Sequence, residues 1–261
     1  MEPRDFVGTP GMAIELSGGP ARWPRASEIA WLTPEQLCRE GFRRSRVVMI
    51  NEAQSGGRRC VRNRVIGRRI LPVAWAGGAR LLAMEMLGPP GGEPPAPEVL
   101  QQPDMAALLA AAGGLGFRVS GYDADGNAVP IGLRTITRSP RFSNWRDSVQ
   151  AANLAALMKD LPADQRMLVW ATNLHHSKVR YMAYQPTGWR FRQVTGVDPF
   201  VIDQTVTVTF VERRVTNPVL GWAQAELRRR DGNAGYIWRE GLPRLSAGSD
   251  AWLLSLDNRL E

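Results

Sequence analysis

Lysine is almost absent from this sequence. Only Lys159 and Lys178 are lysines, although lysine and arginine together account for 33 of the 261 residues. With 25 acidic residues the formal net charge is +8. The arginines are scattered, and no basic block is interleaved with aromatic residues as on many nucleic-acid-binding surfaces. We therefore expect no nucleic-acid partner, and a GC-rich genome explains the preference for arginine equally well.

Cysteine and long apolar runs are also scarce. Cys38 and Cys60 are too few for a disulfide framework, and neither belongs to a CxxC motif. The longest apolar run, residues 105–117, is interrupted by glycine and is shorter than the ~20 residues of a membrane span. The first 30 residues do not resemble a secretory leader. We expect a cytoplasmic protein with no membrane partner, or an exported or periplasmic one if a leader has been removed.

The common catalytic signatures are missing as well. The sequence contains no HExxH, no zinc-type Cys/His spacing, no GxSxG elbow, no P-loop and no GxGxxG. The glycines at 113–116 precede a predicted strand and do not open a helix, so they do not form a dinucleotide-binding loop.

Strands and helices are expected to alternate over most of the chain. "TPEQL" predicts a helix beginning at Thr33, with threonine as the cap and proline at the first helical position. Further helices are expected at about 59–76, 104–112 and 144–159, with Pro72 kinking or shortening the first of them. Strands are expected at 47–50, 80–84, 117–122 and 167–171, and a loop at 88–97. This alternation predicts an α/β fold with a central, mainly parallel sheet flanked by helices.

After Gly188 the pattern changes to short β-like pieces. "VIDQTVTVTFVERR" alternates threonine with apolar residues, and Asp231-Gly232 is a hairpin signal. We expect three parts: an N-terminal arm with a short helix (1–44), an α/β core that carries the site (45–205), and a β-rich C-terminal extension packed on the same domain (206–261).

Each predicted strand of the core ends in a polar residue that is capable of chemistry. In parallel sheets, ligands bind beyond the carboxyl ends of the strands. Four such endings favour a shared site over simple solubility, and they are Asn51-Glu52, Glu85, Asp123, and Asn173 with His175.

The predicted helix that begins near Asn144 carries a polar stripe at positions i, i+4 and i+7, formed by Arg146, Gln150 and Asn153. Such a stripe either lines a polar pocket or lies on the surface. In the surface alternative Asn144 caps the helix, Asp147 favours its N-terminus and Arg146 pairs with a surface acid. Both readings remain open at this point.

The only two histidines, His175 and His176, are adjacent, so in strand geometry only one of them can face the site. A single histidine at a strand end is more often structural than catalytic.

Taken together, five segments of the sequence resemble a known superfamily. They occur in the order "INEAQ…R…LLAMEML", "LGFRVSGYDA", "NWRDSVQAANLAALM", "MLVWATNLHH" and "RYMAYQPTGWRFRQVTGVDPFVIDQT". They are similar to the erythromycin-esterase-like, ChaN-like and Tiki-like superfamily, in particular to bacterial members with NE-x-H and TG-x-DP…IDQ motifs, over about residues 45–205. The resemblance implies an α/β fold with a polar cleft at the strand ends.

The resemblance also implies roles for individual residues. In the esterase branch a first-motif histidine activates water, the Tiki branch uses metal-dependent proteolysis, and ChaN-like members are linked to haem. On this basis the expected catalytic residues are Glu52, Glu85, Arg146 and His175. The expected substrate-binding residues are Gln54, Asp123, Asp147, Gln150, Asn153 and Asn173.

Gln54 departs from the family pattern, which has histidine at that position. Glutamine does not titrate, so it cannot act as a general base. Either Glu52 or Glu85 serves as base with His175 as acid or electrostatic partner, or catalysis has been lost and the protein only binds a small ligand. We predict no cofactor and no required metal, with a divalent metal or haem left open by the resemblance. The expected partner is a small-molecule substrate or ligand, and the oligomeric state is not predicted.

Overall fold

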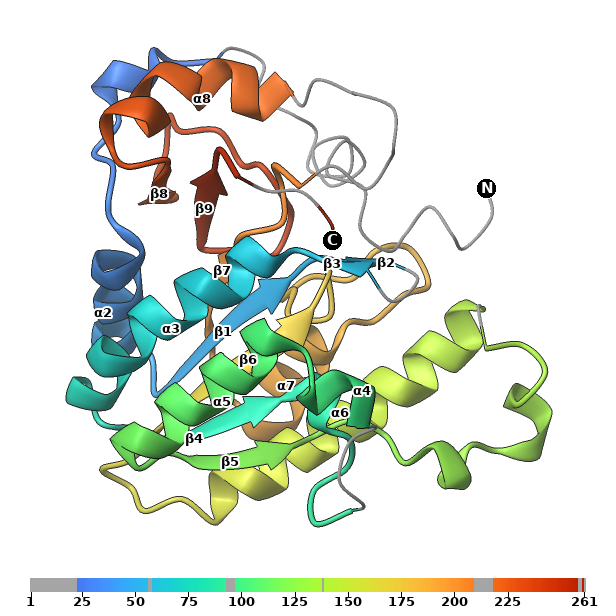
Figure 1. Ribbon diagram of the computed structural model, residues 1–261. Helices are drawn as coiled ribbons and strands as arrows, with labels where there is room; N and C mark the ends of the chain where they lie inside the picture. Colours follow the sequence, from blue (N-terminus) through green and yellow to red (C-terminus); the bar gives the residue numbers. More distant parts are fainter. Residues whose placement is uncertain are drawn as a thin grey trace.

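A seven-stranded sheet organises the molecule (Figure 1). The computed structural model describes residues 23–55, 58–92, 97–137, 139–208, 218–257 and 260. The strand order is β5-β4-β6-β1-β7-β9-β8, and all neighbours are parallel except β8 and β9. The predicted α/β fold with a mainly parallel sheet is therefore confirmed. The strands are β1 Val47–Glu52, β4 Ala79–Met84, β5 Arg118–Gly121, β6 Arg166–Thr172, β7 Phe200–Asp203, β8 Asn233–Ile237 and β9 Ala251–Ser255.

Helices cover both faces of this sheet. In Figure 1, α2, α3 and α5 lie in front of the strands, and α6 and α7 lie behind them. Alternate residues of β1 explain this layering, because Val48 and Ile50 join the front core while Met49 joins the rear core. The helices are α2 Pro34–Arg44, α3 Val61–Ala76, α4 Pro97–Leu100, α5 Pro103–Leu115, α6 Pro140–Lys159, α7 Thr187–Thr195 and α8 Pro218–Arg229. A short antiparallel pair, β2 Gln54–Ser55 and β3 Arg58–Arg59, follows β1.

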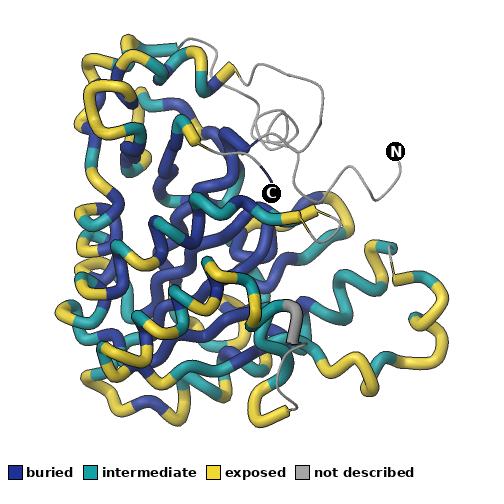
Figure 2. Tube along the Cα trace, viewed as in Figure 1, coloured by how far each residue is buried: buried dark blue, intermediate teal, exposed yellow. Residues whose placement is uncertain are grey.

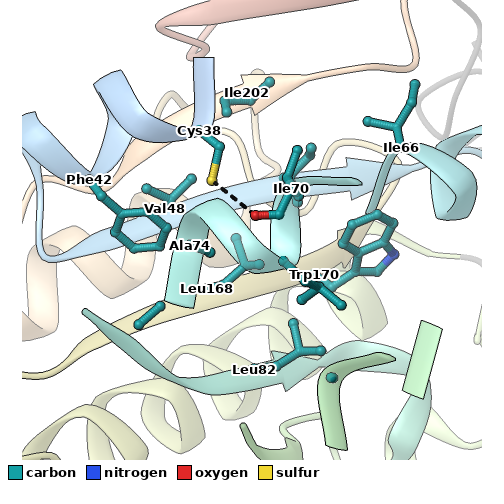
Figure 3. Packing of buried hydrophobic residues seen from close by; sticks show 14 of the residues in the cluster. Cys38, Phe42, Val48, Ile66, Ile70, Ala74, Leu82, Leu168, Trp170 and Ile202 are labelled. Atoms are coloured by element: carbon teal, nitrogen blue, oxygen red, sulfur yellow. Dashed lines mark hydrogen bonds between the residues drawn. The ribbon is translucent and has the colours of Figure 1, made fainter. Parts of the chain in front are cut away.

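The front core packs closely against Trp170 (Figure 3). A Cβ added at Gly67 of α3 would lie 2.6 Å from the Trp170 ring, so only glycine fits there. The thiol of Cys38 lies 3.9 Å from the carbonyl oxygen of Ile70. Burial raises the pKa of Cys38 to about 12 and that of Cys60 to about 11. Both thiols therefore stay protonated at neutral pH and are poor nucleophiles.

The helix starts follow local capping chemistry. Thr33 and Gln36 form a capping box at the start of α2, which confirms the predicted start. α6 begins four residues earlier than predicted, because Ser139 caps it and Pro140 occupies the first turn. Asn144 is therefore not a cap, and the surface alternative was wrong on this point. Its side chain instead donates to the carbonyl oxygen of Ala183 and accepts from the amide of Gln185.

The C-terminal part contains more helix than the sequence predicts. Residues after Gly188 continue in α7, and α8 lies within the region expected to be β-rich. Asp231 and Gly232, both with positive φ, connect α8 to β8 and do not form a hairpin. Pro72 lies inside α3, which continues to Ala76 instead of ending early. Most of the alternating segment "TVTFVERR" lies outside the described residues.

Burial follows the sheet. In Figure 2 the strands are mostly dark blue, whereas the segment that precedes α6 projects from the body and is largely exposed. None of the helices in the described ranges is long and apolar enough to cross a membrane.

Candidate functional site

Polar residues from three neighbouring strands meet at one edge of the sheet. Glu85 directly follows β4, Asp123 lies two residues beyond β5, and His175 lies three residues beyond β6. Because β5, β4 and β6 are adjacent and parallel, their carboxyl ends lie side by side. α6 packs behind this edge and contributes Arg146, Asp147, Gln150 and Asn153. We refer to Glu85, Asp123, Arg146, Asp147 and His175 as the strand-end site.

Arg146 joins two of the carboxylates. Its Nη2 donates to Oε1 of Glu85 at 2.8 Å and to Oδ2 of Asp123 at 2.7 Å. Its Nε donates to Oδ1 of Asp123 at 2.8 Å. Burial lowers the pKa of Arg146, but Glu85 and Asp123 outweigh this and raise it above its ordinary value. The predicted polar stripe therefore faces inward, and Arg146 is a permanent cation between two strand ends.

His175 is held by Asp147 and Tyr184. Nδ1 of His175 lies 2.7 Å from Oδ1 of Asp147 and 3.0 Å from the hydroxyl of Tyr184. Burial lowers the pKa of His175, but the charges of Asp147 and Glu85 raise it overall to about 9. The imidazole is therefore protonated at neutral pH, so Nδ1 donates to Asp147 and Nε2 also carries a proton.

Glu85 faces the other nitrogen of His175. Its Oε1 lies 4.0 Å from Nε2 of His175, beyond direct hydrogen-bonding distance. Thr172 donates to both carboxylate oxygens, through its amide to Oε2 at 2.8 Å and through its hydroxyl to Oε1 at 2.9 Å. Glu85 is almost fully buried, whereas the side chain of Arg146 is 29% exposed. The site is therefore open to solvent mainly beside the guanidinium group.

The remaining residues of the helix stripe support this arrangement. Gln150 donates to Asp123 at 2.8 Å and accepts from Thr187 at 2.6 Å. The amide of Thr187 donates to Asp147, and its single hydroxyl proton is shared between Gln150 and Asp147. Asn153 donates to the carbonyl oxygens of Tyr122 and Asp123. Gln150 and Asn153 thus position the site from behind, and the contacts of Asn153 are with backbone only.

Glu52 and Gln54 belong to an adjacent network on the α3 side. Arg64, which is 1% exposed, donates from Nε and Nη2 to the two oxygens of Glu52 at 2.8 and 2.7 Å. Trp170 donates its indole N–H to Glu52 at 2.8 Å, and the side-chain amide of Gln54 also donates to Glu52. Within the described ranges no hydrogen bond or ion pair joins Glu52 directly to Glu85, Arg146 or His175.

The two networks meet through residues at the end of β6. Thr172, which binds Glu85, pairs in register with Glu52 of β1. Asn173 has a positive φ of 45°, and its side chain exchanges two hydrogen bonds with the backbone of Gln54. Asn173 therefore holds the end of β6 against Gln54, between the two networks. Its side-chain oxygen and nitrogen are both hydrogen-bonded to the backbone of Gln54.

His176 differs from His175 in its hydrogen bonding and its protonation. It is 1% exposed, and neither ring nitrogen has a hydrogen-bond partner among the described residues. Burial lowers the pKa of His176 to about 4, so its ring is neutral at pH 7. Of the two adjacent histidines, His175 is thus charged and His176 is neutral at pH 7.

Sequence reasoning missed several residues of the site. Tyr184 and Thr187 come from a loop and a helix start after β6, and they approach His175 and Asp147 only through tertiary packing. Arg64 was within the predicted arginine-rich helix but carried no signal that singled it out. Thr172 is the last residue of β6, one position beyond the predicted strand.

Comparisons with known proteins yield likeness in structure alone. No protein-family model matches the sequence, and no curated protein matches it significantly. The type III effector HopBA1 is 13% identical with a TM-score of 0.47, over 87% of this chain and 94% of that one. A Bacillus cereus protein is 12% identical with a TM-score of 0.48, over 96% and 97% of the two chains.

A third similar solved structure is that of RRSP, a MARTX toxin effector domain from Vibrio vulnificus. It is 13% identical with a TM-score of 0.45 over 73% of this chain, which spans only 37% of the length of that toxin chain. The superfamily resemblance noted in the sequence has no support from a family model. These three solved structures are thus a type III effector, a toxin effector domain and a Bacillus cereus protein, and they assign no function to this chain.

Proposed function

We propose that this chain hydrolyses a small ester or amide, in the manner of an erythromycin-esterase-like enzyme, with Glu85, Arg146 and His175 as catalytic residues. The supporting observation is the facing pair at the strand ends. Nε2 of His175 lies 4.0 Å from Oε1 of Glu85, while Nδ1 of His175 is held by Asp147. A water molecule or a substrate oxygen bridges a gap of this size between two polar groups.

In the first step, Glu85 acts as the general base. It takes one proton from a water molecule as the water oxygen attacks the carbonyl carbon of the substrate. The carbonyl oxygen becomes an oxyanion, and it accepts a hydrogen bond from Nη1 of Arg146, which the carboxylates of the site leave unused.

In the second step, His175 acts as the general acid. Its Nε2 proton passes to the leaving oxygen or nitrogen as the bond to the carbonyl carbon breaks. The products are a carboxylic acid and an alcohol or amine. The proton on Glu85 then returns to Nε2 of His175 across the same gap, which restores the starting state.

Glu52 and Gln54 take no part in the proposed reaction. Both oxygens of Glu52 accept hydrogen bonds from Arg64, and Trp170 and Gln54 add further donors. No hydrogen bond or ion pair among the described residues joins Glu52 to His175, whereas Oε1 of Glu85 lies 4.0 Å from Nε2 of His175. Of the two candidate bases suggested by the sequence, we therefore select Glu85.

The proposed reaction uses no metal and no haem, because the donor sets do not fit either group. Arg146 engages Glu85 and Asp123, and His175 is protonated, so these groups are poor ligands for a divalent cation. Among the described residues no group of three or more His, Cys, Asp or Glu side chains is arranged to hold a metal ion. His176 is enclosed by protein and presents no open nitrogen to a haem iron.

The test is hydrolysis of a panel of p-nitrophenyl esters and anilides by the purified chain. We expect Glu85→Gln and His175→Gln each to lower kcat by about 100-fold or more, as for loss of a general base or acid. Glu28→Gln makes the same chemical change as Glu85→Gln at a side chain that is 63% exposed, and it should leave kcat unchanged. Full activity in both site variants would exclude the proposal. Binding of panel compounds without any hydrolysis would favour the alternative, a non-catalytic ligand-binding protein.

A further inference from the structure

The acceptors of the strand-end site are already engaged by internal donors. Thr172 and Arg146 bind Glu85, and Arg146 and Gln150 bind Asp123. Asp123 also accepts from the amide of Ala124. Asp147 accepts from His175, Tyr184 and Thr187. A ligand that offers mainly donors therefore finds few partners here.

Charged donors of the same site, in contrast, remain unused. Nη1 of Arg146 has two N–H groups and makes no hydrogen bond within the described part of the chain. Nε2 of His175 also makes none, since its nearest carboxylate oxygen lies 4.0 Å away. Both groups are cationic, and the guanidinium is partly exposed. The surplus of charged donors favours a ligand with negatively charged oxygens.

Two further arginines stand beside this site. Nε of Arg190, in the first turn of α7, donates to the carbonyl oxygen of Gln185 at 3.0 Å, next to Tyr184. The guanidinium of Arg180 lies over the ring of Trp189, 5.5 Å from its centroid. Burial lowers the pKa of Arg190, and the nearby charge of Arg180 lowers it further against the opposing effect of Asp147. Arg190 lies one helical turn after Thr187, which binds Asp147, and Arg180 stacks on the adjacent Trp189, so both arginines lie at the edge of the site.

Neither of these arginines forms an ion pair within the described ranges, although other cations of the same region do. Lys178 lies 2.8 Å from Asp250, and Arg192 of the same helix lies 3.3 Å from Asp198. Arg180 and Arg190 thus add positive charge next to the unused donors.

We propose that the substrate of the strand-end site carries an anionic oxygen group, a carboxylate or a phosphate, which Arg190 and Arg180 recognise beside the bond to be cleaved. The cleavage of this substrate rests on the proposed hydrolase function, whereas the binding of its anionic group does not depend on that function. Nη1 of Arg146 faces the reacting carbonyl, whereas Arg190 and Arg180 select the substituent. Arg190 and Arg180 are therefore specificity-determining residues.

Binding is tested first, without catalysis. Inorganic phosphate and acetate are titrated separately into the full chain, followed by NMR of the two histidine side chains and by calorimetry. We expect saturable binding of at least one anion at one site, with a shift of the His175 signals. Arg190→Gln should weaken it about tenfold, as expected for loss of one partly buried ion pair. The relative affinities show whether phosphate or carboxylate is preferred.

Arg192→Gln is the matched control, because it removes the same charge from the same helix at a residue paired with Asp198. It should change the affinity less than twofold. Equal losses in Arg190→Gln and Arg192→Gln, or no saturable binding of either anion, would overturn the inference.

Selectivity is tested second, with the p-nitrophenyl ester of benzoic acid and the mono-p-nitrophenyl ester of terephthalic acid, whose carboxylate cannot reach its own ester carbonyl. We expect a higher kcat/KM for the anionic ester, and about a tenfold drop in that preference in Arg190→Gln but not in Arg192→Gln. Hydrolysis of both esters with no preference overturns the inference and leaves the hydrolase proposal intact. Anion binding that depends on Arg190, with no hydrolysis of either ester, supports the inference and counts against the hydrolase proposal.

Discussion

Asp147 accepts a hydrogen bond from Nδ1 of His175 across 2.7 Å, and both side chains are buried. This contact fixes which imidazole nitrogen faces the remainder of the site. It also supplies the negative charge that contributes most to raising the pKa of His175 against the effect of burial.

Replacement of Asp147 by asparagine should therefore lower the pKa of His175 from about 9 toward its ordinary value, by about one unit or more. The amide keeps the shape of the carboxylate but removes the charge. The chain has only two histidines, so an NMR titration reports each one without overlap. Asp198→Asn, at an exposed carboxylate, should leave the titration unchanged. An unaltered pKa of His175 in Asp147→Asn would contradict the pairing.

The two histidines should give opposite dependences of stability on pH. The pKa of His175 is raised to about 9, so its contribution is complete below about pH 6.5 and is lost as the pH rises through 9. The pKa of His176 is lowered to about 4, so stability is lost as the pH falls from 6.5 through 4. Each shift corresponds to about 3 kcal/mol.

Urea unfolding between pH 4.5 and 9.5 measures this effect. The free energy of unfolding should be greatest near pH 6.5. The difference between the wild type and His175→Gln should shrink as the pH rises from 6.5 to 9.5. A difference that stays constant with pH would rule out a protonated His175 in the folded state.

Glu52 should contribute to stability instead of catalysis. In Glu52→Gln the new amide N–H groups would face the donors of Arg64 and Trp170, and the buried guanidinium would keep only Asp104 as a counter-charge. We expect a loss of about 3–5 kcal/mol in the free energy of unfolding. Glu40→Gln, which removes only surface ion pairs with Arg43 and Arg44, should cost less than about 1 kcal/mol. Similar losses in the two variants would contradict the structural role of Glu52.

Gly188 supports the turn that carries both histidines. A Cβ at this position would lie 2.1 Å from the carbonyl oxygen of His176, which is backbone and cannot move aside without displacing the turn. Gly188→Ala should therefore destabilise the protein by about 3 kcal/mol. Gly221→Ala in α8 makes the same change where nothing lies within 4 Å, and it should stabilise by about 0.5–1 kcal/mol. Thermal unfolding of the two variants measures this difference in stability. Equal stabilities of Gly188→Ala and Gly221→Ala would contradict the close packing of Gly188.

Gln54→His places a histidine next to Glu52, at the position where the superfamily that the sequence resembles has one. If the remaining site supports that chemistry, hydrolysis of simple esters should rise by about tenfold or more, because a titrating group becomes available. Gln54→Asn keeps an amide at this position and should give no increase. The absence of any gain in Gln54→His would show that the Glu52 network has no latent catalytic role.

The strand ends were the part of the site that sequence could predict. A parallel sheet places successive strand ends at one edge, so Glu85, Asp123 and His175 could be grouped from their positions alone. The inward stripe of Arg146 and Gln150 followed from helical spacing. The same reasoning placed Glu52 with them. In the structure the carboxylate of Glu52 instead binds Arg64 of α3.

The parts that depend on tertiary contacts could not be predicted. Tyr184 approaches His175 from a loop whose position is set partly by Asn144, and nothing in the local sequence indicates that contact. α7 was missed because it is only nine residues long and includes two threonines and a glycine, which favour helices weakly. Whether a residue faces a neighbour or solvent in such segments is decided by packing and not by pattern.

The order of strands has a consequence for how the chain acquires its fold during synthesis. β9, the last strand among the described residues, lies between β7 and β8, and within those residues β8 pairs with no other strand of the sheet. Until Ala251–Ser255 have been translated, one edge of β7 has no partner and β8 cannot join the sheet. Unpaired strand edges invite intermolecular association. The nascent chain therefore has to pass through a state with an open edge, which β9 closes.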